Sequence, residues 1–174
     1  METTSALTIV IPLEFHNKIN DIRSTYDPAY PRWIPHINLI FPFVPTTQFN
    51  DIKSMLETKL KNYGIIKVEL DVVGSFKQKN KYSFHLKPKK PLRLQLLFKI
   101  ITECLPDVKI KHSTFNPHMT LAIVDANKKD EMEAILKNEF KEGITFNLDR
   151  ICLLKRSKTD NTIPFTINYE IMIT

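Results

Sequence analysis

The sequence lacks several features that would mark particular classes of protein. No apolar run approaches the length of a membrane span, and residues 1–5 form neither a basic segment nor the start of a long apolar one, so we expect no membrane association or secretion. The two cysteines, Cys104 and Cys152, have no CxxC spacing, so we interpret them as buried free thiols rather than a disulfide or metal ligands. The sequence therefore predicts a cytoplasmic protein, with the nucleus as the alternative.

Acidic residues are absent between Asp71 and Glu103, although this stretch is rich in basic residues. The eight basic positions are Lys77, Lys79, Lys81, Lys87, Lys89, Lys90, Arg93 and Lys99. A concentrated patch of one sign attracts polyanions and makes their binding salt-dependent, which suits an RNA or nucleotide ligand. The alternative is a lysine-rich surface that only contacts solvent.

Apolar periodicity predicts alternating strands and helices along the 174 residues, with no linker or low-complexity segment. We expect strands at 6–12, 65–76, 82–86, 146–154 and 163–173, and helices near 15–22, 46–63, 91–101 and 127–140. This order indicates an α+β fold of one domain, residues 1–174. We expect two pseudo-symmetric lobes of antiparallel sheet, with helices outside and a central cleft between them.

One short motif occurs twice, at 33–39 (WIPHINL) and 115–121 (FNPHMTL), and the two copies align without a gap. After each proline, polar and apolar residues alternate, as they do in a half-buried strand. His36 and Asn38 therefore leave one face of the first strand, while His118 and Thr120 leave one face of the second. A single histidine beside a proline is more often structural, but two matching copies favour a functional pair.

Two histidines on separate strands are suited to acid–base chemistry at phosphorus. The imidazole pKa is about 6.5, so near neutral pH one ring can accept a proton from the attacking oxygen while the other protonates the leaving oxygen. Thr120 and Asn38 can each donate a hydrogen bond to a non-bridging phosphate oxygen. A metal site built on His36 and His118 ranks lower, because no carboxylate or cysteine stands at a characteristic spacing.

The two motifs resemble those of the two-histidine phosphoesterase superfamily, whose hallmark is His-x-Thr/Ser followed by an apolar residue, twice. That superfamily includes 2′-5′ RNA ligase-like proteins and 2′,3′-cyclic nucleotide phosphodiesterases. The resemblance implies a bilobed α+β domain whose cleft holds His36 and His118 as the catalytic pair, with Thr120 binding phosphate. It implies no metal or other cofactor. Asn38 departs from the usual Thr or Ser, although its amide still donates a hydrogen bond.

We therefore expect a monomeric hydrolase that opens 2′,3′-cyclic phosphates or cleaves 2′-5′ phosphodiester bonds in RNA or oligonucleotides. RNA end-joining would be the reverse reaction at the same site. The alternative is a catalytically weakened or inactive module that binds RNA ends or nucleotides, with Asn38 reflecting lost chemistry.

Aromatic residues near the motifs are candidates for base or substrate contacts, because aromatic rings stack on bases. Trp33 and Phe115 each precede a motif histidine by three positions, and Tyr82 lies in the basic stretch. The remaining histidines lie outside the motifs, and we interpret them as surface or structural residues. They are His16, His85 and His112.

Overall fold

One lobe is built on a sheet of four antiparallel strands in the order β2-β1-β8-β9. A computed structural model describes residues 1–110 and 114–174, so His112 lies outside the described residues. The strands are β1 (Ser5–Val10), β2 (His36–Ile40), β8 (Arg150–Lys155) and β9 (Thr166–Met172). The sheet thus combines strands from both ends of the chain, with β1 and β8 at its centre.

The other lobe is built on three antiparallel strands in the order β4-β5-β6. They are β4 (Val72–Gln78), β5 (Lys81–Lys87) and β6 (Met119–Asp125). Alternation along β5 points Phe84 and Leu86 into the core, whereas His85 leaves the opposite face. In register, Gly74 on β4 and Thr120 on β6 are the neighbours of His85.

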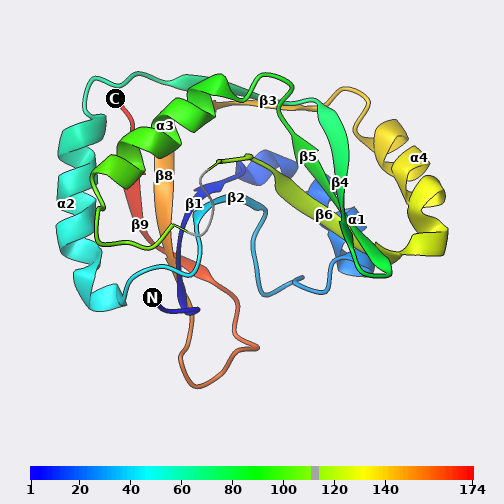
Figure 1. The fold of residues 1–174 in the computed structure, drawn as a ribbon, viewed down its shortest axis with the longest axis horizontal. Helices are drawn as coiled ribbons and strands as arrows, with labels where there is room; N and C mark the ends of the chain where they lie inside the picture. Colours follow the sequence, from blue (N-terminus) through cyan, green and yellow to red (C-terminus); the bar gives the residue numbers. More distant parts are fainter. Residues whose placement is uncertain (111–113) are drawn as a thin grey trace.

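The helices cover the outer faces of the two lobes (Figure 1). Short 3-10 turns η1 (Leu13–Phe15), η2 (Thr46–Gln48) and η3 (Ala126–Lys128) lead into α1 (His16–Tyr26), α2 (Phe49–Leu60) and α4 (Lys129–Glu139), and α3 is Leu92–Glu103. α2 packs on β9, whereas α1 packs on β6 and α4 on β4 and β6. The α+β class and the two lobes of antiparallel sheet are thus confirmed.

The lobes do not coincide with the two halves of the chain. α1 follows β1 in sequence, yet it packs against β6 of the other sheet. β8 and β9, from the end of the chain, complete the sheet that β1 and β2 begin. The chain therefore crosses between the lobes several times, which ties them together.

The strands expected at 65–76 and at 146–154 each cover parts of two strands with different partners, so both predictions were wrong. β3 (Ile66–Leu70) pairs with β7 (Ile144–Leu148), whereas β4 pairs with β5. Asp71 separates them: its carboxylate accepts a hydrogen bond from the backbone N–H of Lys89 at 2.8 Å. The alternation of apolar and polar residues continues across Asp71 and does not reveal such a change of partner.

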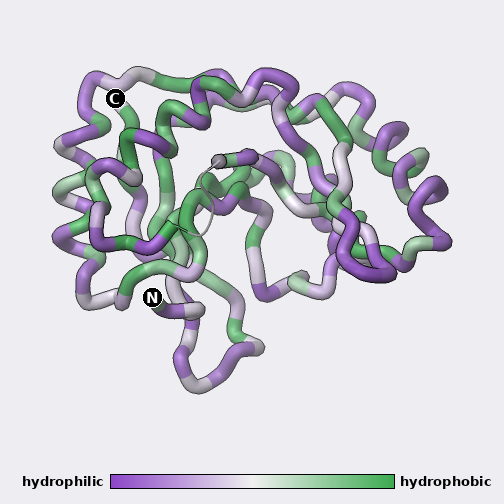
Figure 2. Tube along the Cα trace, viewed as in Figure 1, coloured by the Kyte–Doolittle hydropathy of each residue, from purple (hydrophilic) through white to green (hydrophobic). Residues whose placement is uncertain are grey.

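Buried apolar side chains from the sheets of the two lobes, from the two-stranded β3-β7 sheet and from the inner faces of the helices form the main core. Figure 2 shows hydrophilic and hydrophobic residues alternating along the outer helices, as expected for amphipathic helices with one buried face. A smaller cluster on the first sheet contains Ala6, Cys152, Leu154 and Phe165. Within the described residues, no helix is long and apolar enough to cross a membrane.

Candidate active site

The two sequence motifs lie at the starts of two strands from different sheets. His36 is the first residue of β2, and His118 directly precedes β6. β2 and β6 are in contact with one another. The structure therefore brings the repeated motifs together at the junction of the two lobes, although the two histidines lie far apart in the chain.

Both histidines make the same hydrogen bond to the backbone. Nδ1 of His36 lies 2.7 Å from the carbonyl oxygen of Ile34. Nδ1 of His118 lies 2.7 Å from the carbonyl oxygen of Asn116. A carbonyl oxygen can only accept, so Nδ1 carries the proton in each ring. Nε2 is then the nitrogen that can exchange a proton with a substrate.

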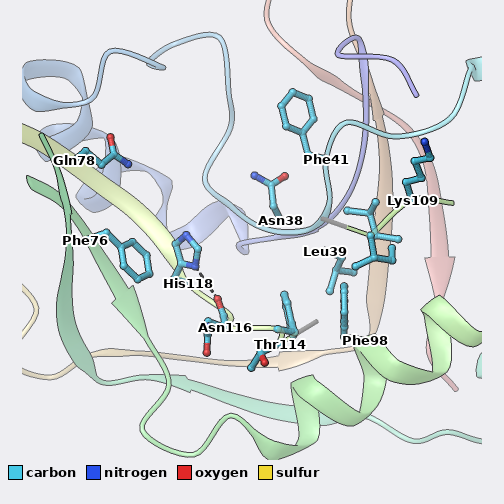
Figure 3. Close-up of a pocket in the computed structure, with 13 residues that line it drawn as sticks. Asn38, Leu39, Phe41, Phe76, Gln78, Phe98, Lys109, Thr114, Asn116 and His118 are labelled. Atoms are coloured by element: carbon cyan, nitrogen blue, oxygen red, sulfur yellow. Dashed lines mark hydrogen bonds between the residues drawn. The ribbon is translucent and has the colours of Figure 1, made fainter. Parts of the chain in front are cut away.

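A cavity of about 850 Å³ opens beside the motif strands. Its lining residues are Asn38, Leu39, Ile40, Phe41, Phe76, Gln78, Phe98, Lys109, Ile110, Thr114, Phe115, Asn116 and His118. Figure 3 shows Asn38 on one side of this cavity, with His118, Phe76 and Gln78 on the other. His36 and Thr120 are half-buried and are not among the lining residues.

The environment of His36 favours the neutral ring. Burial, followed by the positive charges of Arg23 and His118, lowers the pKa of His36 to about 4, against the opposing effects of the Ile34 carbonyl and Asp27. Arg23 itself is buried and donates to the Asp27 carboxylate at 2.8 Å. At neutral pH, His36 is thus a proton acceptor.

In each motif, the residue two positions after the histidine faces the same way as that histidine. Asn38 is exposed and lines the cavity, and Thr8 is its ladder partner on β1. Thr120 is half-buried and has His85 as its ladder partner on β5. Both side chains carry hydrogen-bond donors of the kind that can meet a phosphate oxygen.

Trp33 lies against the first catalytic candidate. Its ring stacks on His36, with ring centroids 4.6 Å apart and an interplanar angle of 20°. Phe165 lies 3.9 Å from the Trp33 ring, and Phe41 meets it edge-on at 5.0 Å. The indole is therefore held between side chains of the protein, and it shields His36 from solvent.

The other two aromatic candidates lie in different surroundings. Phe115 stacks on Phe98 at 4.4 Å, and both rings line the cavity. Tyr82 shares a strand face with buried Phe84 and has Lys129 of α4 over its ring at 5.6 Å. Strand alternation thus places Tyr82 on the helix-covered face, away from His85, and the structure does not bring it to the cavity.

His85 is buried, which excludes the surface alternative for this residue and leaves the structural one. It is 1% exposed and its ring centroid lies 5.0 Å from that of His118. In the sequence, the available signal was that His85 lies within an expected strand, which could pair with the strand of the second motif and share a face with it. His16, by comparison, lies outside the cavity and contacts the carbonyl oxygen of Ile11 at 2.8 Å.

The motifs in the sequence do not point to the other polar residues of the cavity wall. Gln78 follows Phe76 at the strand period of two, so a correct register for β4 would have predicted it. Lys109 follows α3 in an irregular segment and carries no periodic signal. None of the basic residues between 77 and 99 is among the residues described as lining the cavity.

Potential metal ligands do not cluster in the described part of the chain. Across residues 1–110 and 114–174, no group of three or more His, Cys, Asp or Glu side chains could hold a metal ion.

The fold, with a histidine motif at the head of one strand in each lobe, defines a bilobed two-histidine protein. The model of the 2′-5′ RNA ligase superfamily matches residues 11–160, and the chain belongs to this family. A Staphylococcus haemolyticus protein, "Putative phosphoesterase SH1944", is 26% identical over 117 residues, which cover 67% of this chain and 68% of that protein.

Solved structures share the fold over almost the whole chain. E. coli LigT in its apo form has a TM-score of 0.68 and 16% identity, covering 99% of this chain and 98% of LigT. TT0787 of Thermus thermophilus has a TM-score of 0.64 and 14% identity, covering 98% of this chain and 97% of TT0787. At these identities the likeness concerns the fold alone.

Proposed function

We propose that this chain is a phosphoesterase that acts on RNA or oligonucleotides by acid–base catalysis with two histidines and no metal ion. It opens 2′,3′-cyclic phosphates or cleaves 2′-5′ phosphodiester bonds. The observation that carries the proposal is the matching orientation of His36 and His118. Each holds Nδ1 on a backbone carbonyl and keeps Nε2 for the substrate, on strands that are in contact.

The neutral state of His36 suits the role of base in hydrolysis. His36 Nε2 takes a proton from the attacking water while His118 Nε2 gives a proton to the leaving ester oxygen. The new P–O bond to water forms as the ester P–O bond breaks, and both rings then exchange protons with solvent. Thr120 and Asn38 donate hydrogen bonds to the non-bridging oxygens, where negative charge increases in the transition state.

Complexes of proteins with the same fold support the proposal of a nucleotide substrate. E. coli LigT has been solved in complexes with 3′-AMP, ATP and NADP+. In this chain, Phe115 and Phe98 offer aromatic surface in the cavity, and Lys109 adds a positive charge there. These groups suit a base and a phosphate respectively.

A substrate panel tests the proposal. The wild type is expected to turn over at least one of 2′,3′-cyclic mononucleotides, RNA ending in a cyclic phosphate, 2′-5′ oligoadenylate and ADP-ribose cyclic phosphate, with the same rate in EDTA. His36→Ala and His118→Ala are each expected to lower kcat by about 100- to 10,000-fold. His16→Gln is the matched control and is expected to keep wild-type activity. Full turnover by either alanine variant would contradict the assignment.

Asn38 supports a second candidate function, a module that binds RNA ends or nucleotides without turning them over. Its amide is longer than the Thr or Ser of the usual motif and is exposed at the cavity. Under this alternative, the wild type and both alanine variants bind a cyclic-phosphate RNA equally well, and no product forms. Product formation by the wild type rules it out.

A further inference from the structure

Phe76 on β4 is an exposed aromatic residue in the wall of the cavity. It is 42% exposed and lines the cavity together with Gln78. Strand alternation places these two side chains on the same face of β4, and Figure 3 shows both on the side of the cavity that carries His118. β4 is an edge strand of its sheet, so no further strand continues this wall.

The Phe76 ring is held in place from one side. The His85 ring stacks on it, with centroids 4.4 Å apart and an angle of 25°. Gly74 leaves room for that stack, since a Cβ there would come within 2.6 Å of His85 Nε2. The His118 ring meets Phe76 edge-on, with centroids 5.2 Å apart. The phenyl ring is thus fixed against the protein, and its exposed surface is left to the cavity.

The pseudo-equivalent position in the other lobe is covered. β1 and β8 of the first lobe correspond to β5 and β4 of the second, and their registers place Leu154 where Phe76 lies. Leu154 is fully buried in a cluster with Phe165, and Trp33 packs against that cluster. The second lobe therefore leaves open a place that the first lobe fills with its own aromatic rings.

An open aromatic face beside an amide suits a nucleobase. Bases of any kind stack on aromatic side chains, because every base has a π-face. The Gln78 amide adds hydrogen-bond donors and an acceptor for the edge of a base. Because Phe76 contacts the His118 ring, a base stacked on Phe76 lies within the reach of one nucleoside of a phosphate at His118.

The wall continues from Gln78 into the hairpin between β4 and β5, whose tip is basic. Lys79 and Lys81 are exposed there, and Lys81 is the ladder partner of Gln78. The contact of Lys81 with Asp125 is long, at 3.9 Å, and both side chains are exposed, so it neutralises little of this charge. Exposed cations next to a base-sized aromatic surface are complementary to the phosphates of a single-stranded nucleic acid.

The opposite wall carries a second aromatic surface. Phe98 and Phe115 stack on one another at 4.4 Å, and both line the cavity. Aromatic side chains therefore lie on both sides of the cavity. A mononucleotide has one base and can use only one of these walls, whereas an oligonucleotide can use both.

We propose that Phe76 and Gln78 form a nucleobase subsite on the His118 side of the cavity, and that a single-stranded oligonucleotide continues from it over Lys79 and Lys81. This inference rests on the proposed function, in which a phosphate of RNA or an oligonucleotide lies at His36 and His118. It makes an oligonucleotide the preferred ligand over a cyclic mononucleotide.

The test measures binding of a dye-labelled adenylate hexamer with ordinary 3′-5′ linkages, by fluorescence anisotropy, against a ribose-phosphate chain of the same length without bases. Phe76→Leu keeps an apolar side chain but cannot stack, so Kd for the hexamer is expected to rise at least about fivefold. Kd for the chain without bases is expected to stay unchanged. Phe76→Trp keeps the stack and is expected to bind the hexamer at least as tightly as the wild type.

Three outcomes contradict the subsite. They are no binding of the hexamer by the wild type, wild-type affinity in Phe76→Leu, and an equal loss of affinity for both ligands. The last would show that Phe76 only supports its neighbours. Gln78→Ala provides a second variant that leaves the packing of the rings intact, and its Kd for the hexamer is expected to rise about threefold. Tyr82→Leu, on the helix-covered face of the same hairpin, is the matched control and is expected to bind both ligands as the wild type does.

The basic tip is tested separately. Lys79→Ala with Lys81→Ala is expected to weaken binding of both ligands by the same factor and to reduce the dependence of Kd on salt, because these side chains meet phosphates and not bases. Unchanged binding would remove the tip from the path of the chain. None of these measurements needs turnover. Absence of turnover together with Phe76-dependent binding would contradict the proposed chemistry alone, whereas turnover together with Phe76-independent binding would contradict the subsite alone.

Discussion

The two motif strands have the same backbone arrangement but different surroundings. His36 and His118 make matching Nδ1 contacts of 2.7 Å to the carbonyl two residues earlier. His36 is then covered by Trp33, whereas the equivalent Phe115 stacks on Phe98 instead of on His118. His118 lines the cavity, with Phe76 and His85 beside it.

This difference shows that the position of each histidine ring and its protonation state are set by different residues. The repeated residues set the orientation of each ring, with Nδ1 held on a backbone carbonyl. Non-repeated neighbours then set the charge: burial beside Trp33 keeps His36 neutral. A symmetric pair of imidazoles thereby becomes an asymmetric pair, which is the condition that the proposed base and acid roles require.

After the two histidine substitutions, the largest expected effect comes from removing a motif donor. Thr120→Val replaces a hydroxyl by a methyl of similar size, and we expect kcat to fall by about 100- to 1000-fold, as for one well-placed oxyanion donor. Asn38→Leu tests the equivalent donor in the other lobe. Steady-state kinetics on the best substrate of the panel measures both. Equal and small losses would show that neither side chain meets the phosphate.

The dependence of the free energy of unfolding on pH reports on the buried imidazole in each lobe. His36 and His85 have pKa values near 4 in the fold, below the unfolded value, so between about pH 6.5 and pH 4 only the unfolded chain takes up the protons. The contribution of the two neutral rings to the free energy of unfolding is therefore complete above pH 6.5. It falls as the pH drops to 4, by about 3 kcal/mol for fully buried His85 and less for half-buried His36.

Urea unfolding at several pH values measures that loss. His36→Gln is expected to remove the smaller part of the decline, and His36→Gln with His85→Gln most of it. An unchanged slope in the double variant would contradict the burial of both rings in solution.

Trp33→Leu is expected to make the two histidines more alike. Without the stacked indole, water reaches His36 and its pKa rises from about 4 towards the ordinary value. At pH 5.5 the base is then mostly protonated, and kcat/KM is expected to fall about tenfold, with full recovery above pH 7.5. Phe115→Leu, at the equivalent position, is the control, with no displacement of the acid limb. A profile of Trp33→Leu that overlays the wild type would refute this role for the indole.

The smallest effect is expected from Asn38→Thr, which gives both motifs a threonine two residues after the histidine. Because both side chains donate a hydrogen bond, kcat is expected to change by no more than about threefold. A gain of a hundredfold or more would instead show that Asn38 weakens the enzyme. Kinetics with Asn38→Thr and Asn38→Leu side by side distinguishes loss of a donor from a change of its shape.

Much of the fold and the family could be predicted from local pattern. The α+β class, the two lobes and the family resemblance are confirmed. They were accessible because a proline before an alternating run predicts a strand and its faces, and because the His-x-Thr type of motif is local in sequence. The roles of His36, His118 and Thr120 remain proposals that the geometry supports.

The errors share one physical cause, which is that strand partners are chosen over long distances. The break at Asp71 depends on β7 and β5, which pair with neighbouring parts of one alternating stretch. The burial of His85 and the position of Tyr82 on the helix-covered face depend on the register of β5 between β4 and β6. The two-residue periodicity of a strand shows that it has two faces, but not which face lies toward the cavity.

The amino-acid sequence by itself determined the repeated strands, their imidazoles and the side of each strand from which they project, because these follow from proline and from a period of two. Only the tertiary structure decided that β2 and β6 meet, that Trp33 covers His36 and that His85 lies beside His118. Desolvation and dipole effects act through space over a few ångströms, so they depend on neighbours that packing brings together and that the chain order does not reveal.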